Sequence, residues 1–296
     1  MQRPRRRGPA ILAAALALAS AVLLLLLLRC GGGKPRSGSQ PVYAAPGHTS
    51  SSGGGPAPAA KLNASVVVLV IASREPVYAL QWAVWSRLKD DHPDVAVYLL
   101  VANESLAAPQ IDEAAGLLQL PMRESYIPGI LDKTVEGLRV MLSDTRRSFK
   151  YVLRTNMSSM WHWARFMAHV AALPASGVFA GVTFEMSEHP GVTFASGAGY
   201  TVSRDVARTI VEGAAELNKH VLDDVAVGLL LGKRGVRPTG MGRCDLTDGK
   251  LPAPLDDGKC HHWRTKNHDR LKYDGYLMSR LYFELYPLPP ALVQRQ

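Results

Sequence analysis

The sequence predicts an α/β fold in which a mostly parallel β-sheet is covered by helices on both faces, behind an N-terminal transmembrane helix. Two patterns carry this prediction. Short apolar runs rich in β-branched residues alternate with segments whose apolar residues recur at helical spacing, which is typical of βαβ units. Near the N-terminus, residues 10–28 form 19 consecutive positions without a charge, long enough to cross a bilayer as a helix.

The charge of the chain is concentrated in its N-terminal leader. The 296 residues carry a formal net charge of +9, but seven basic and no acidic residues lie in residues 1–60, which leaves +2 on the rest. A body so close to neutral argues against nucleic-acid binding. The denser arginine cluster precedes residues 10–28, so the positive-inside bias predicts a cytoplasmic tail over residues 1–9, a signal anchor and a body across the membrane. A cleaved signal peptide is the alternative, but its apolar region is usually shorter and ends in small residues.

The segment after the anchor, residues 29–60, predicts a flexible stem. Residues 31–60 hold eight Gly, five Pro and five Ser, too little apolar surface to offset the entropy of ordering the chain. Residues 61–296 then form a single globular domain, which gives the layout of a type II membrane protein. Cys30 stands beside the anchor, where it is either palmitoylated or unmodified.

Hydrophobic periodicity predicts the elements of this domain in order. The run over residues 66–73 reads as a strand buried on both faces, and Leu80, Val84 and Leu88 share one face of the helix that Pro76 opens. The further strands are predicted over residues 95–101, 151–154, 178–184 and 194–203. The further helices are predicted over residues 111–120 (short), 131–144, 160–173 (rich in Trp), 205–217 and 223–233.

Ligands of such sheets bind beyond the carboxyl ends of the strands, which directs attention to residues 155–159. Nucleotide-sugar transferases commonly place an Asp-x-Asp there, because two carboxylates hold a divalent cation against a diphosphate. Here the segment is uncharged: Asn156 and Ser158 are suited to hydrogen-bond a phosphate or ribose and are poor ligands for a hard cation.

Two further motifs carry candidate residues. Gly197 and Gly199, in Ser-Gly-Ala-Gly-Tyr, permit positive φ and close approach of the backbone to a ligand. The motif lacks the third glycine of a dinucleotide fingerprint, so a nicotinamide cofactor is excluded. Asp223 and Asp224 stand at a predicted helix start, where they either cap the helix or supply a general base for a sugar hydroxyl.

The C-terminal part offers a basic and histidine-rich segment. Arg264, Lys266 and Arg270 are suited to neutralise a diphosphate, and a solvated surface segment is the alternative. Three nearby histidines are candidate metal ligands: His261, His262 and His268.

Two features depend on the compartment. Cys244 and Cys260 are expected to pair in an oxidising lumen, with free thiols as the alternative. Asn-x-Ser sequons at Asn63, Asn103 and Asn156 can carry glycans only in such a lumen and only where they are exposed.

Taken in order, several motifs resemble the β-1,3-galactosyltransferase and Fringe-like family of Golgi glycosyltransferases over roughly residues 64–240. They are Lys133-Thr134 on a helix, the strand entering residues 155–159, Phe-Ala-Ser-Gly-Ala-Gly-Tyr-Thr-Val-Ser ending at Ser203, and Asp-Asp-Val-Ala-Val-Gly ending at Gly228. The resemblance implies a GT-A-like, Rossmann-type fold, a UDP-sugar donor, Mn²⁺, a glycan or glycoprotein acceptor, and transfer with inversion. It also implies a single-pass type II protein of the Golgi membrane with its body in the lumen.

Carried over residue by residue, the resemblance makes Asp224, or else Asp223, the base that deprotonates the acceptor hydroxyl. Gly197 and Gly199 would shape the active-site loop, and Ser73 and Arg74 would face the nucleotide. The chain departs from the family where Asn156-Met157-Ser158 replaces the acidic motif. Two expectations follow: a hexosyltransferase that holds the diphosphate with basic side chains, or an inactive relative that binds a glycan or a partner enzyme. The basic side chains on offer are Lys133, Arg154, Arg264 and Lys266.

Overall fold

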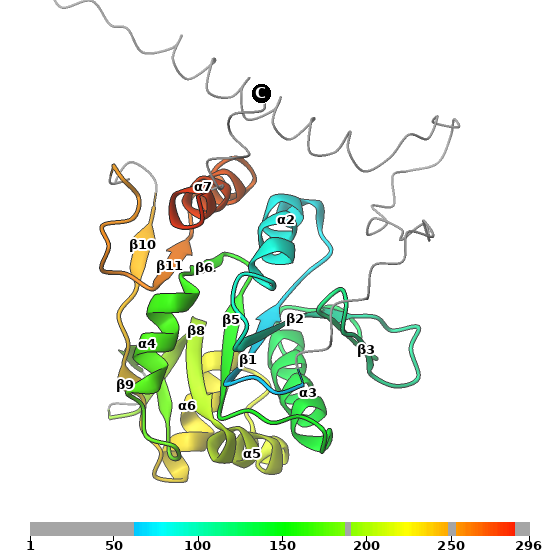
Figure 1. The fold of residues 1–296 in the computed structure, drawn as a ribbon. Helices are drawn as coiled ribbons and strands as arrows, with labels where there is room; N and C mark the ends of the chain where they lie inside the picture. The colour runs from blue at the N-terminus through cyan, green and yellow to red at the C-terminus, as the bar shows by residue number, and fades with distance from the viewer. Residues whose placement is uncertain (1–61, 187–190, 248–252, 288–296) are drawn as a thin grey trace, which may run out of the picture. The chain divides into compact units, whose positions relative to one another are not determined.

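A computed structural model describes residues 62–186, 191–247 and 253–287 (Figure 1). All of them belong to one compact unit, residues 51–296. The predicted tail, anchor and stem, with Cys30, lie outside the described residues. Within the part of the chain that is described, no helix is both long and apolar enough to cross a membrane.

A mixed eight-stranded sheet runs through the centre of the unit (Figure 1). Its spatial order is β3-β4-β2-β1-β5-β8-β7-β9. Strand β8 runs antiparallel to β5 and β7, and β3 runs antiparallel to β4, so the sheet is mixed where the sequence predicts a mostly parallel one. The strands are β1 (Val66–Ile71), β2 (Val95–Ala102), β3 (Gln110–Asp112), β4 (Leu117–Leu120), β5 (Tyr151–Asn156), β7 (Phe179–Glu185), β8 (Thr193–Ser203) and β9 (Thr239–Gly240).

Helices cover both faces of this sheet, as predicted. Alternate residues of β1 enter two separate apolar clusters, one shared with α2, α4 and α7 and the other with α3, α5 and α6. Because β1 is buried on both faces, an uninterrupted apolar run is what its position requires. The helices are η1 (Pro76–Tyr78), α2 (Ala79–Leu88), α3 (Gly129–Ser143), α4 (Trp163–Ala171), α5 (Arg204–Glu212), η2 (Ala214–Glu216), α6 (Asp223–Lys233) and α7 (Arg270–Leu285).

A second, three-stranded sheet joins the C-terminal part to the centre of the chain. It consists of β10 (Cys244–Leu246), β11 (His262–Thr265) and β6 (Ser159–Trp161), in that order. Strand β11 is parallel to β10 and antiparallel to β6.

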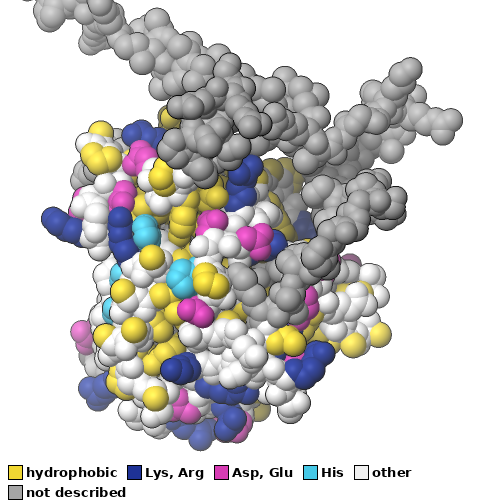
Figure 2. Space-filling view, viewed as in Figure 1, with side chains coloured by type: hydrophobic (Ala, Val, Ile, Leu, Met, Phe, Trp, Pro, Cys, Tyr) yellow, Lys and Arg dark blue, Asp and Glu magenta, His cyan; other side chains and the backbone are white. Residues whose placement is uncertain are grey.

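The side chains on the face shown in Figure 2 mix Lys and Arg with Asp and Glu.

The predicted short helix over residues 111–120 is wrong, because these residues form β3 and β4. Gly116 lies between the two strands with φ 61°, and a Cβ there would come 2.7 Å from the carbonyl oxygen of Val97. The Asp112 carboxylate accepts a hydrogen bond from the Ala115 N–H at 2.9 Å, which closes the turn. A tight turn that only glycine fits therefore decides against a helix.

Two further differences concern the Trp-rich segment and the C-terminus. The helix predicted over residues 160–173 begins at Trp163, because Ser159–Trp161 form β6, which pairs with β11. The ring of His162 accepts a hydrogen bond from the Arg165 N–H and so caps the first turn of α4. Helix α7, which the sequence analysis does not predict, packs against α2 (Figure 1).

Candidate functional site

A cavity of about 430 Å³ lies at the carboxyl ends of β1 and β5. Its size is within the usual range of small-molecule sites. Of the residues singled out from the sequence, it brings together Ser73, Lys133, Asn156, Ser158, Arg264, Lys266 and Arg270. The lining residues that the sequence analysis missed include Glu75, Tyr78, Glu124, Ser125 and Tyr126.

The C-terminal basic residues reach this cavity through contacts between β11 and the segment that replaces the acidic motif. The backbone N–H and the hydroxyl of Thr265 both donate to the carbonyl oxygen of Ser158, at 2.8 and 3.0 Å. Arg264 stands opposite Ser159 in the β11–β6 register. The two cations that flank Thr265 therefore lie beside residues 156–158.

Positive charge is concentrated on this side of the cavity. Arg264 and Lys266 form no ion pair with any residue that the structure describes, whereas Arg270 pairs with the fully buried Asp274 at 2.9 Å. Burial lowers the pKa of the Arg264 guanidinium, the nearby Arg243 and Arg270 lower it further, and Asp245 and Asp224 oppose the shift. An anion at this place would relieve that repulsion.

Lys133 reaches the cavity but is committed to protein partners. Its ammonium is buried and donates to the carbonyl oxygen of Ala72 at 2.7 Å and to the carboxylate of Glu124 at 2.6 Å. Burial lowers the pKa of Lys133, and Glu124 opposes that shift. The side chain thus ties the end of β1 to the segment before α3.

The two aspartates at the start of α6 point into the protein and do not line the cavity. Asp223 forms a buried ion pair with Arg154 at 2.6 Å, and Asp224 accepts a hydrogen bond from the Gly197 N–H at 2.8 Å. Burial raises the pKa of Asp223, although Arg154 opposes it. Asp224 lies close enough to Arg264 to stabilise its charge, which connects this pair to the cavity.

Gly197 and Gly199 lie inside β8, and neither has the positive φ that the sequence analysis allowed for. The absence of a side chain at both positions allows neighbouring groups to pack closely against the strand. A Cβ on Gly199 would come 2.5 Å from the Trp161 ring, and one on Gly197 would come 3.2 Å from both Arg154 and Asp224. These glycines therefore shape a strand and not a loop.

Arg74, predicted to face the nucleotide, lies on the surface with its guanidinium 3.3 Å from Gln119, and it does not line the cavity. Tyr126, in contrast, lines the cavity with 68% of its surface exposed. It belongs to a connecting segment without periodicity or motif, so the sequence carries no signal for it.

The donor set that residues 156–158 offer to this cavity does not fit Mn²⁺. Its residues at the acidic-motif position offer an amide and a hydroxyl, and the Asn156 oxygen already accepts a hydrogen bond from Arg154 at 3.0 Å. Hard divalent cations prefer carboxylates. Within the described part of the chain, the one group of three close ligand side chains is Cys244, Asp257 and Cys260, and its two sulfurs form a disulfide.

The three candidate histidines do not converge on a common point. His262 is fully buried and stacks on Trp161 at 3.9 Å, while His261 stacks on His169 at 5.0 Å. Among the described residues, none of His261, His262 and His268 belongs to a group of three side chains able to share an ion. The first two pack in the aromatic core instead.

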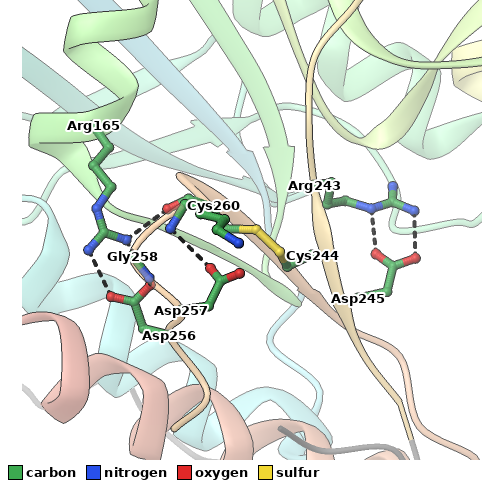
Figure 3. The surroundings of a disulfide bond; sticks show 9 residues. Arg165, Arg243, Cys244, Asp245, Asp256, Asp257, Gly258 and Cys260 are labelled. Atoms are coloured by element: carbon green, nitrogen blue, oxygen red, sulfur yellow. Dashed lines mark hydrogen bonds and ion pairs between the residues drawn. A yellow bond between two sulfur atoms is a disulfide. The ribbon is translucent and has the colours of Figure 1, made fainter.

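The disulfide between Cys244 and Cys260 joins β10 to the segment that precedes β11 (Figure 3). On one side of it, Arg165 holds both carboxylate oxygens of Asp256 at 2.8 Å and donates to the Cys260 carbonyl at 2.9 Å. Next to Cys244, Arg243 pairs with Asp245 and also donates to Ser196 at 3.0 Å. These contacts brace the strand that carries Arg264.

The three sequons differ in access. Asn63 is exposed, whereas the Asn103 amide donates to Gln119 at 3.1 Å. Asn156 lines the cavity. Asn63 is therefore the most open of the three acceptors.

Comparison with known protein families gives one match. Residues 182–241 match the sequence model of the Galactosyltransferase family. The comparison with curated proteins found no match. The matched segment runs from β7 to β9 and contains the glycines of β8 and both aspartates of α6, while residues 155–159 lie outside it. The match covers 60 of the 296 residues and shows that this segment is similar to the Galactosyltransferase family.

Proposed function

We propose that the chain is a hexosyltransferase that transfers a sugar from a UDP-sugar to a hydroxyl of a glycan or glycoprotein, with inversion. One observation carries the proposal: the hydrogen bond between the Gly197 N–H and the Asp224 carboxylate. It joins two elements of the family-matched segment and fixes a carboxylate near Arg264, which itself lines the cavity.

In the proposed reaction, Asp224 is the general base. The acceptor oxygen attacks the anomeric carbon from the face opposite the nucleotide, its proton passes to the Asp224 carboxylate, and the bond from the sugar to the diphosphate breaks. Positioned proton transfer of this kind contributes roughly 10²–10⁴-fold to a rate. Asp223 is the weaker candidate, because Arg154 occupies its carboxylate.

We also propose that the protein is a single-pass type II protein of the Golgi membrane. The apolar segment over residues 10–28 supports an anchor, and the Cys244–Cys260 disulfide and the exposed Asn63 suit an oxidising lumen. Protease protection of the full chain inserted into microsomes tests this topology, and a body digested without detergent would contradict it.

The test of the enzyme uses the full-length chain purified in detergent. UDP release from common UDP-sugars is measured with glycan acceptors, for the native chain and for Asp224→Asn. The variant is expected to lose at least about 100-fold in rate. The matched control is Asp132→Asn. This change removes a carboxylate on α3 that forms a surface ion pair with Lys219. If no UDP-sugar is turned over, the enzyme proposal fails.

The second candidate is a glycosyltransferase-like protein that binds a glycan or a partner enzyme without turnover. The uncharged residues 156–158 and the ion pair that occupies Asp223 favour it. Binding of UDP without any turnover would support this candidate.

A further inference from the structure

We infer that the cavity binds the diphosphate of its nucleotide without a divalent metal ion, and that Arg264 and Lys266 hold the phosphates in its place. The inference rests on the proposed function, since it concerns how the same donor is bound. It starts from the donor set at residues 156–158, which does not fit a hard cation.

The two cations lie beside residues 156–158, which replace the acidic motif. Arg264 lies in β11, Lys266 directly follows Thr265 at the end of that strand, and both line the cavity. Both hydrogen bonds of Thr265 to the Ser158 carbonyl fix them beside the segment that would otherwise carry the metal-binding carboxylates. Arg264 and Lys266 therefore lie where a metal ion held by such carboxylates would supply positive charge.

The formal charges of Arg264 and Lys266 also suit a diphosphate. Neither Arg264 nor Lys266 forms an ion pair with a residue in the described ranges, so together they bring the same formal charge as one divalent ion. The cavity lining also contains two carboxylates: Glu124 is paired with Lys133, whereas Glu75 remains as an acidic group of the lining. Asp224 and Asp245 only partly offset the charge of Arg264, since neither forms an ion pair with it, and a diphosphate beside Asn156 and Ser158 would supply a direct anionic partner.

The two side chains also have the functional groups that bind phosphate. A guanidinium offers a planar fork that matches two phosphate oxygens, and an ammonium acts as a point charge. Arg264 is half-buried, so its attraction to an anion is less screened than at the surface. Arg243 lies close to Arg264, but its ion pair with Asp245 offsets its charge, and Ser196 holds it in place.

The experiment measures UDP and UMP binding to the full-length chain by calorimetry, once with EDTA and once with Mn²⁺. We expect UDP to bind in EDTA, and Mn²⁺ to change its Kd by less than about threefold. Arg264→Gln and Lys266→Gln should each weaken UDP binding about tenfold, the usual size of a charged hydrogen bond, and weaken UMP binding less.

The matched controls are Arg208→Gln and Lys150→Gln. Both side chains are exposed and neither lines the cavity: Lys150 directly precedes β5, and Arg208 lies on α5, whose first residue bonds to the Lys150 carbonyl. They remove the same charge and should leave Kd unchanged. Should Arg264→Gln fail to fold, the exposed Lys266 still decides the point, and Lys266→Arg should restore most of the affinity.

The outcomes separate this inference from the proposed function. If UDP binds only with Mn²⁺, the inference is overturned while a transferase remains. If UDP binds in EDTA but Lys266→Gln equals the controls, the role of the basic residues is overturned. If UDP binds under neither condition, the proposed function itself fails.

Discussion

The Arg154 guanidinium and the Asp223 carboxylate form an ion pair at 2.6 Å in which both side chains are almost completely buried. The pair joins β5 to the start of α6. The same guanidinium donates to the Asn156 amide oxygen and to the Gly197 carbonyl oxygen. Arg154 therefore organises the junction behind the cavity, and its charge is not free for a diphosphate as the sequence analysis expected.

Removing one partner of this pair should destabilise the protein strongly, because the other charge would remain buried and unpaired. Arg154→Met and Asp223→Asn should each cost about 3–5 kcal/mol. The double variant Arg154→Met with Asp223→Asn should cost clearly less than the sum of the two single changes. Urea denaturation of all four proteins measures this coupling. Additive costs would contradict a direct interaction.

Gly199 should tolerate no side chain. The added Cβ would stand 2.5 Å from Trp161 and 2.9 Å from His262, and both rings are fully buried. Gly199→Ala should therefore cost about 1–3 kcal/mol through overpacking. The control is Gly232→Ala in α6, where no atom lies within 4 Å and alanine favours the helix by up to about 1 kcal/mol. Equal denaturation midpoints for the two variants would refute this account of the β8 packing.

The disulfide should stabilise the part of the fold that carries Arg264. Cys244 and Cys260 are 16 residues apart, and closing a loop of that size is worth about 3 kcal/mol. Replacing both cysteines with serine should lower the free energy of unfolding by about that amount. Dithiothreitol, which reduces the disulfide, should lower the free energy of unfolding of the native chain to a similar extent. A reductant that lowers the stability of the double serine variant as well would show that its effect does not come from this bond.

Elements governed by local patterns could be predicted from the sequence. The apolar run of β1 and the helical spacing in α3 place both elements almost where the structure has them. Residues 111–120 could not be assigned in this way, since a few apolar positions suit a short helix and a hairpin equally, and the turn at Gly116 decides. Helix α7 was likewise not predicted.

The site shows the same division. Most of the polar cavity residues could be named from the sequence, because they follow strands or stand in motifs. It left open whether Arg264 and Lys266 face a ligand or solvent. That depends on contacts such as the hydrogen bond from Thr265 to Ser158, across 107 positions of the chain, which no local pattern reports.

Acidification should destabilise the protein well above the pH at which its paired carboxylates are protonated. Burial lowers the pKa of His261 to about 4, with His169 adding to the shift, and burial lowers the pKa of His262 still more clearly. The unfolded chain, with histidine pKa values near 6.5, then binds more protons than the folded one. Stability should be full above about pH 7 and fall by at least about 1 kcal/mol towards pH 5.

Urea midpoints between pH 7.5 and 4.5 measure this dependence. His261→Asn should flatten the slope between pH 6.5 and 5, whatever it does to stability at pH 7.5, because the residue that must be neutral in the folded state is gone. The exposed His220→Asn is the control and should leave the slope unchanged. Paired carboxylates such as Asp256, whose pKa is lowered chiefly by Arg165, lose their contribution only at more acidic pH. A slope that His261→Asn leaves intact would assign the acid sensitivity to other groups.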